Sequence, residues 1–119
     1  MRMWMVDPRK MCDQHLLGEH VELHMLVGTL IRKRSVAGFV ANKLIEVHNV
    51  RLRHAELVVE MTRRGMKHQS PLPSFRAVKL GKVSVRANLL ELARRCENCR
   101  MKRHGGGRAE KSGKATLSG

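Results

Sequence analysis

The sequence predicts a single all-α domain, and three observations point to that fold class. Apolar residues recur every three or four positions in three stretches, near residues 9–31, 48–64 and 84–102, as on one face of a helix. No stretch has a convincing strand pattern. The length of 119 residues allows one modest hydrophobic core and no second domain. We therefore expect a compact three-helix domain over residues 1–104, with an N-terminal arm packed between the helices, and a flexible basic tail at 105–119.

A short apolar arm precedes the first helix. It covers residues 1–6 and ends at Asp7 and Pro8. Proline suits the start of a helix, because its φ angle is already fixed and its missing N–H is not needed there. The first helix is therefore expected over residues 9–31. Three cations follow it, at the negative end of the helix dipole: Arg32, Lys33 and Arg34.

This first helix carries two different faces. His15, Glu19 and Glu22 are spaced i, i+4 and i+7, so they share one polar face. An apolar stripe for packing lies about a quarter turn away and consists of Leu16, Leu23, Val27 and Leu30. Two carboxylates beside a histidine are costly unless positive charge faces them. The polar face is therefore expected to meet a cation.

Irregular segments separate the first helix from the other two. Residues 35–46 are expected to form a connection with at most one short turn of helix. The second helix is expected over residues 48–64, with Gly65 as its stop. Residues 70–74 contain two prolines and predict a turn that no helix crosses. Residues 75–82 are ambiguous between a loop and a short irregular segment.

The third helix is expected over residues 84–102. Its packing residues have near-heptad spacing: Val85, Leu89, Leu92, Cys96 and Cys99. The tail that follows, GGGRAEKSGKATLSG, holds glycines, cations and almost nothing to bury. Alone, such a segment should be disordered.

Composition points to a polyanionic partner inside the cell. The chain has 24 Lys and Arg against 10 Asp and Glu, a formal charge of +14, which favours nucleic acid over a membrane surface. No run of 18 apolar residues and no signal peptide is found, so an intracellular protein is expected. Three cysteines, an odd number, fit a reducing compartment. With only three aromatic residues, base stacking on an aromatic row is poorly supported: Trp4, Phe39 and Phe75.

Two short patterns are similar to metal sites. Cys96 and Cys99 form a lone C-x-x-C pair, but a structural zinc site needs four ligands and the remaining thiol, Cys12, is far away in sequence. We therefore expect two small residues on the packing side of a helix. The run HVELH, from His20 to His24, has its glutamate one position too late for a zinc protease helix. No metal ligand is assigned, and both histidines are expected near the helix surface or against phosphate.

Three segments together carry a resemblance to a known family. They are MRMW at the start, CDQHLLGEHVELHMLVG from Cys12, and RHAELVVEMTRRGMKHQSPLP from Arg53. In this order they resemble the pyrimidine-dimer DNA glycosylases, the phage endonuclease V type and its cellular relatives. The resemblance covers about residues 1–31 and 49–73, close to half the chain.

The resemblance implies an all-α fold and a reaction that uses the chain's own N-terminal amine. That amine would attack the sugar C1′ of the lesion nucleotide and form an imine, the glycosidic bond would break, and β-elimination would cut the strand. No metal or organic cofactor is expected, because the imine supplies the electron sink. An α-amine suits this role, because its reference pKa of roughly 7.7–8.0, against about 10.4 for lysine, leaves more of it neutral.

On the family pattern the nucleophile falls on Met1, which the bulky Arg2 should protect from removal. The essential glutamate falls on Glu22, which would stabilise the cationic intermediate and shuttle protons. Arg2 and His15 would contact phosphate or the deoxyribose. Glu19 is grouped with these substrate-binding residues and would have a supporting role, orienting Arg2 or a neighbouring backbone. Further phosphate contacts are assigned to His20, His24, Arg63 and Arg64.

Two departures from the family keep a second function open. Val21 and Met25 stand where the phage enzyme has basic residues, and its C-terminal aromatic segment has no counterpart here. As an enzyme, the protein is expected to act as a monomer on duplex DNA with a damaged base. The alternative is a non-enzymatic RNA-binding protein, such as a ribosome-associated component that contacts rRNA, which the charge and the basic tail support.

Overall fold

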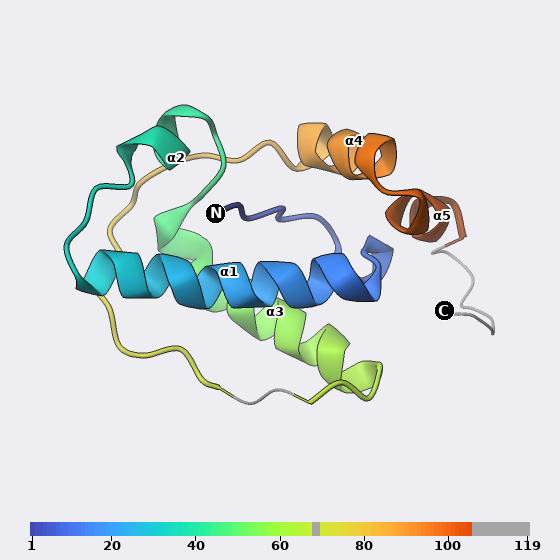
Figure 1. Cartoon of the computed structure of the whole chain (residues 1–119), viewed down its shortest axis with the longest axis horizontal. Coiled ribbons are helices and arrows are strands. Elements are labelled where there is room, and N and C mark those ends of the chain that lie inside the picture. Colours follow the sequence, from blue (N-terminus) through green and yellow to red (C-terminus); the bar gives the residue numbers. More distant parts are fainter. Residues whose placement is uncertain (68–69, 106–119) are drawn as a thin grey trace.

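A computed structural model describes residues 1–67 and 70–105, and over these residues the protein is helical without a strand (Figure 1). The predicted all-α class is confirmed. The expected disorder of the tail concerns residues that, from 106 on, lie outside the described part. The elements in chain order are η1 (Pro8–Lys10), α1 (Asp13–Ile31), α2 (Ala37–Ala41), η2 (Val47–Asn49), α3 (Val50–Arg63), α4 (Val85–Arg95) and α5 (Glu97–Gly105).

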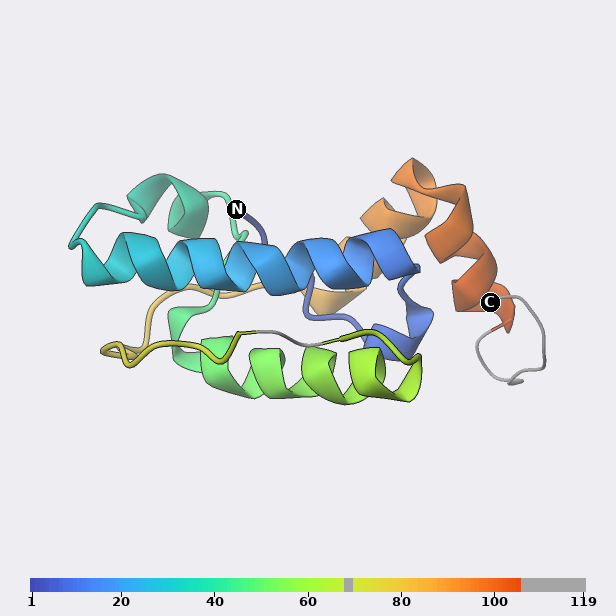
Figure 2. The same cartoon turned by 60° about the horizontal axis from the view of Figure 1, so that its bottom comes forward.

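The core forms where α1 packs against α3 (Figures 1 and 2). The predicted apolar stripe of α1 faces this core, with Leu16, Leu23 and Val27 fully buried. Leu57 and Met61 of α3 are fully buried in the same cluster. A helix of 19 residues gains most of its stability from such a buried face rather than from propensity alone.

Gly65 ends α3 as predicted. Its φ is +79°, in the left-handed region that favours glycine. The Met66 N–H can therefore reach back to the Met61 carbonyl at 2.8 Å, which satisfies one of the orphan carbonyls of the last turn.

The third predicted helix is in fact two helices, α4 and α5. Ser84 caps α4 by accepting a hydrogen bond from the Ala87 N–H at 3.1 Å. At Cys96 the backbone is extended, with φ −131° and ψ 115°, and the helix ends. The expectation of one continuous helix over 84–102 is therefore wrong. The apolar spacing continues through Cys96 and Cys99, so the sequence gives no sign of a break. The break at Cys96 turns α5 toward η1 (Figure 1).

The N-terminal arm packs inside the fold, as predicted. It runs between α1 and α4 (Figure 1), with Met3, Trp4 and Val6 buried. The Met3 N–H donates to the Leu44 carbonyl at 2.7 Å, just after α2. The start of the chain is thus fixed against the first helical connection.

In the described residues of the connection between α3 and α4, 64–67 and 70–84, there is no helix, in agreement with the prolines at 71 and 73. Its end lies beside η2, where the Val47 N–H donates to the Leu80 carbonyl at 2.9 Å. Gly81, with φ +94°, passes so close to the Ile45 carbonyl that a β-carbon would sit 2.2 Å from its oxygen. Among the described residues, no helix has the length and apolarity needed to cross a membrane.

Candidate active site

The carboxylate of Glu22 meets the first peptide unit of the chain. The Arg2 backbone N–H donates to Glu22 Oε1 at 2.5 Å. Three covalent bonds separate this nitrogen from the Met1 amine, so the two nitrogens are less than about 4 Å apart. The structure therefore brings the predicted nucleophile and the predicted glutamate into one small region, between the arm and the middle of α1.

Arg2 turns its side chain inward, along the arm. Its guanidinium lies 3.9 Å from the centre of the Trp4 ring, and Nη2 donates to Asn88 Oδ1 at 2.7 Å. Burial, followed by repulsion from Arg95, lowers the pKa of Arg2, while the carboxylates of Glu91 and Glu22 oppose this shift. Stacking on Trp4 and the bond to Asn88 hold Arg2 in one geometry, which fixes the residue after the amine.

Asn88 of α4 is a site residue that sequence reasoning missed. Its side chain is buried, and Nδ2 donates to the carbonyls of Trp4 at 2.9 Å and Met3 at 3.3 Å. With Oδ1 accepting from Arg2, one amide binds three groups of the arm. A signal was available, since Asn88 lies four residues before the buried Leu92, on the packing side of its helix. The expectation that Val85 packs is wrong, because its side chain is 49% exposed.

Glu19 is fully buried, so its carboxylate is not available to substrate at the surface. Arg53 of α3 donates to its two oxygens, from Nε at 2.7 Å and from Nη2 at 2.8 Å. The same guanidinium donates from Nη1 to the Val6 carbonyl at 2.7 Å. The expected contact of Glu19 with Arg2 is not formed, because both oxygens of its carboxylate accept from Arg53. Arg53 is a second residue that the sequence did not single out.

His15 lies at the start of α1, half-buried among sulfur atoms and Trp4. Nδ1 is 3.3 Å from Cys12 Sγ and 3.5 Å from Cys99 Sγ. The ring packs edge-on against Trp4 with centroids 5.9 Å apart. Burial, followed by repulsion from Arg95, lowers the pKa of His15. The separation of Cys12 from the C-x-x-C pair in sequence is therefore not a separation in space.

His20 and His24 lie on the side of α1 that faces α3, in a cluster with His54. The centroid of the His20 ring is 4.9 Å from that of His24 and 4.9 Å from that of His54. His20 is buried, in contrast to the expected position near the helix surface. These two histidines border a cavity of about 360 Å³ that Val21 and Lys67 also line.

Arg63 and Arg64 differ in what they can offer to a phosphate. Arg64 is mostly buried and donates to the carbonyls of Pro8 at 3.0 Å and Met11 at 2.7 Å, so its role is structural. Arg63 is 63% exposed but donates to both oxygens of Glu60. The outer face of α1 carries apolar side chains, since Val21 is 48% and Met25 54% exposed.

Comparison with known proteins identifies the first part of the chain. The family model for pyrimidine dimer DNA glycosylase matches residues 1–74. This match includes Met1, Arg2, His15 and Glu22 and ends before α4. Searches of curated proteins and of solved structures returned no match. Because the matched segment is more than half of the 119 residues, the chain belongs to the pyrimidine dimer DNA glycosylase family.

Proposed function

We propose that this protein is a DNA glycosylase with AP lyase activity, in which the Met1 amine is the nucleophile and Glu22 the essential acid and base. Membership of the family supports a DNA repair glycosylase in general. The lyase step and the residue roles are our proposal. The enzyme acts as a monomer on duplex DNA that carries a damaged base, inside the cell, and the reaction needs no cofactor.

The observation that carries this proposal is the bond between the Arg2 N–H and Glu22 at 2.5 Å. It holds the arm so that the neighbouring amine and the carboxylate can act on the same sugar. In the reaction, the amine nitrogen bonds to C1′ while the bond from C1′ to the base breaks, and the base leaves with a proton. The bond from C1′ to the ring oxygen O4′ then breaks, a proton passes to that oxygen, and C1′ becomes doubly bonded to the amine nitrogen as the imine. Loss of a C2′ proton then breaks the bond from C3′ to its oxygen.

Glu22 has two tasks in this sequence. As a carboxylate it stabilises the positive charge of the imine, and as a base it accepts protons from the amine and from C2′. Arg2 positions the arm through Trp4 and Asn88. The His15 ring packs against Trp4 of the arm, and its Nδ1 lies among the cysteine sulfurs. We assign the contact with the lesion deoxyribose to its other ring nitrogen, Nε2.

Borohydride trapping on DNA with an abasic site tests the nucleophile. Reduction of the imine should leave a stable adduct with the mass of the chain plus the DNA. Peptide mapping should place the adduct on residue 1. A variant with one extra alanine before Met1 displaces the amine by up to about 3.8 Å and should give little adduct. Equal trapping by this variant, or adduct formation on a lysine, would overturn the assignment.

A matched pair of glutamates tests the acid and base. Glu22→Gln keeps the shape of the side chain and should lower the single-turnover rate of base release by roughly 10²- to 10⁴-fold. Glu56→Gln removes the same charge from α3, where the side chain is 47% exposed, and should retain the wild-type rate. Similar rates for the two variants would contradict the role of Glu22.

The exposed Val21 and Met25 favour a second candidate function, a non-enzymatic RNA-binding role such as a ribosome-associated component. Apolar residues at these positions weaken the grip of α1 on phosphates, while the charge of +14 retains general affinity for nucleic acid. Co-sedimentation with ribosomes at moderate salt, unchanged by Glu22→Gln, together with no trapped adduct would favour this function over the enzyme.

A further inference from the structure

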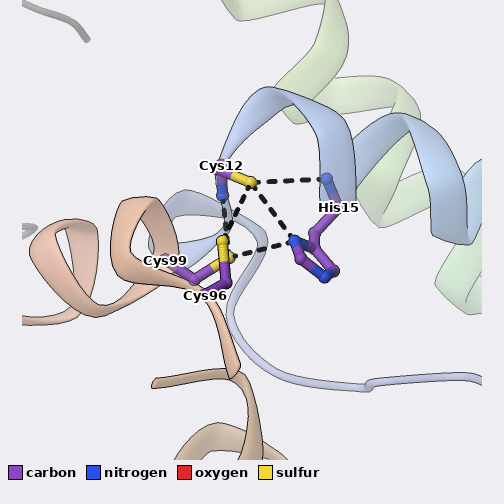
Figure 3. A group of neighbouring side chains, drawn as sticks. All are labelled: Cys12, His15, Cys96 and Cys99. Carbon is purple, nitrogen blue, oxygen red and sulfur yellow. Dashed lines mark hydrogen bonds between the residues drawn. The ribbon is translucent and has the colours of Figure 1, made fainter. Parts of the chain in front are cut away.

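Four potential metal ligands meet where the two ends of the domain come together (Figure 3). Cys12 and His15 lie at the start of α1, and Cys96 and Cys99 lie at the start of α5. The figure shows all four side chains pointing toward one another. One ligand atom from each lies within 4.8 Å of the other three.

The distances in this cluster are those of a tetrahedral site. Zinc bonds of about 2.3 Å to sulfur and 2.0–2.1 Å to nitrogen imply edges of about 3.8 Å between two sulfurs and about 3.6 Å between sulfur and nitrogen. Cys12 Sγ is 3.9 Å from Cys96 Sγ. His15 Nδ1 is 3.3 Å from Cys12 Sγ and 3.5 Å from Cys99 Sγ. A disulfide would need two sulfurs about 2.05 Å apart, and all three cysteines are free.

Local structure aims each ligand at the same point. Cys12 is the N-cap of α1, so its sulfur faces the first turn, where His15 follows three residues later. The extended backbone of Cys96 ends α4 and lets Cys99 enter from the first turn of α5. Backbone N–H groups also point at the sulfurs, from Cys12 to Cys99 Sγ at 3.3 Å and from His15 to Cys12 Sγ at 3.5 Å. Such bonds support thiolate ligands in metal sites.

The attachment of α5 provides an independent observation. Of the α5 side chains that the structure describes, those of residues 97–102, Cys99 is the buried one, and Met101 is 64% exposed. A nine-residue helix is marginal without tertiary packing. One buried thiol provides little apolar surface to hold α5 against the rest of the domain. Small domains often use a structural metal ion to supply the missing stability.

We infer that Cys12, His15, Cys96 and Cys99 bind one zinc ion that fastens α4 and α5 to the start of α1. Three thiolates and one imidazole are a typical donor set for zinc. Because all four positions come from the protein, the site is closed and therefore structural. It joins the family-matched segment to helices that lie beyond it, and through the contact of His15 with Trp4 it also supports the arm.

Zinc at Nδ1 has a consequence for His15. That nitrogen becomes a ligand, and the proton is placed on Nε2, which can then donate a hydrogen bond but cannot accept one. The site does not depend on the proposed reaction, and its metal content can be measured without DNA.

Metal analysis of the full chain is the first test. Protein purified without chelator should contain one zinc per chain. Removal of zinc by a strong chelator should expose three thiols to a thiol reagent and lower Tm by on the order of 10 °C, and zinc should reverse both changes. Wild-type protein that lacks zinc, takes up none and has three reactive thiols at all times would overturn the inference.

Cobalt(II) in place of zinc identifies the ligands. Three thiolates should give charge-transfer absorption in the near ultraviolet, together with the strong visible bands of a tetrahedral ion. The histidine cluster of His20, His24 and His54, whose nitrogens also lie within 4.8 Å of one another, would give no thiolate band. Cobalt binding without that band would overturn the assignment.

Two variants complete the test. Cys99→Ser should lose the zinc, and His54→Ala should keep it. Retention of zinc by Cys99→Ser together with its loss from His54→Ala would place the metal at the histidines and contradict the inference. If Cys99→Ser does not fold, the cobalt spectrum of the wild-type chain decides between the two sites.

Discussion

Glu19 and Arg53 illustrate how single residues determine stability in this small domain. Both side chains have at most 1% exposure, and they are joined by two hydrogen bonds of 2.7 and 2.8 Å. Moving two charges out of water costs several kcal/mol per ion. The two short hydrogen bonds between Glu19 and Arg53 offset this cost. The Arg53 guanidinium also donates to the Val6 carbonyl, and this bond holds the arm against α3.

Arg53→Met should therefore destabilise the fold strongly. The substitution leaves the Glu19 carboxylate buried without its cation, which costs about 3–5 kcal/mol. The loss should appear as a lower midpoint in urea unfolding. The exposed pair of Arg9 and Asp7, with side-chain exposures of 70% and 33%, provides the control. Arg9→Gln should leave the midpoint close to that of the wild type, because an exposed ion pair adds little to stability.

A double variant separates the lost ion pair from simple loss of packing. Glu19→Met combined with Arg53→Met removes both charges and fills similar volume, so it should recover most of the lost stability. Recovery should be incomplete, because the Val6 carbonyl still lacks its donor and a buried unsatisfied acceptor costs about 1–3 kcal/mol. A double variant as unstable as Arg53→Met would show that the unpaired charge is not the cause.

At the scale of elements, α4 holds the arm although it lies outside the family-matched segment. Asn88 makes this connection through the carbonyls of Met3 and Trp4 and through Arg2. Asn88→Ala should release the arm and lower the rate of base release by about tenfold or more, as expected for the loss of buried hydrogen bonds of about 1–3 kcal/mol. Trp4, the single tryptophan, should report the change by red-shifted fluorescence.

Asn98→Ala is the matched control for this variant, because Asn98 is exposed on α5. It should leave both rate and fluorescence unchanged. If Asn88→Ala keeps the wild-type rate with a red-shifted spectrum, the arm does not need α4 for catalysis, and the positioning role of Asn88 is contradicted.

Glu60 lies near the end of α3 and pairs with Arg63 and Arg64, which makes the end of this helix sensitive to pH. Burial alone would raise the pKa of Glu60, but hydrogen bonds from Arg63 and Arg64 outweigh it and hold the pKa below 4.5. A carboxylate with a lowered folded-state pKa adds stability that is present above its unfolded value and is lost as pH falls through the folded value. This contribution should therefore begin to fall near the ordinary value of 4.5 and be lost as the pH passes through the lowered folded-state pKa.

Glu60→Gln should be less stable than the wild type near neutral pH, and the difference should shrink as the pH falls through the lowered folded-state pKa of Glu60, where the wild-type carboxylate also becomes neutral. Urea unfolding at a series of pH values measures this difference. A stability difference that stays constant over the whole range would contradict a contribution from ionised Glu60.

At the scale of the whole molecule, the sequence predicted what depends on local periodicity. The end of α1, the span of α3, the stop at Gly65 and the irregular connection all follow from short-range patterns. The expected start of the first helix at residue 9 is wrong, because Pro8–Lys10 forms the separate 3-10 turn η1 and Cys12 caps α1 at Asp13. The break at Cys96 does not, because it depends on the burial of Cys99 against the start of α1 and leaves the apolar spacing unchanged.

The part of the candidate site that could be predicted is the part that the family resemblance assigned, Glu22 and the N-terminal amine. The resemblance assigned Glu22 to the N-terminal amine, and the structure places Glu22 against Arg2. Pairings between distant segments could not be read from the sequence. Arg53 is 34 residues from Glu19 and Cys96 is 84 residues from Cys12, so each pair looks unrelated until the helices pack.

The net charge of +14 predicts a strong salt dependence for DNA binding. Each phosphate contact adds roughly 0.9 to the slope of log K against log salt. Three exposed cations follow α1, in the turn that leads to α2 (Figures 1 and 2): Arg32, Lys33 and Arg34. Replacing all three with glutamine should lower the slope by up to about 3 units. Fluorescence anisotropy with undamaged duplex DNA over a salt series measures it.

A triple variant of equal charge provides the control. Arg9, Arg63 and Arg94 are also exposed, but each lies within 2.8 Å of a carboxylate oxygen. A phosphate must compete with that carboxylate, so replacing these three with glutamine should lower the slope less. Equal losses from the two triple variants would mean that binding follows net charge alone. A larger loss from the paired arginines would move the DNA-binding face to α3 and α4.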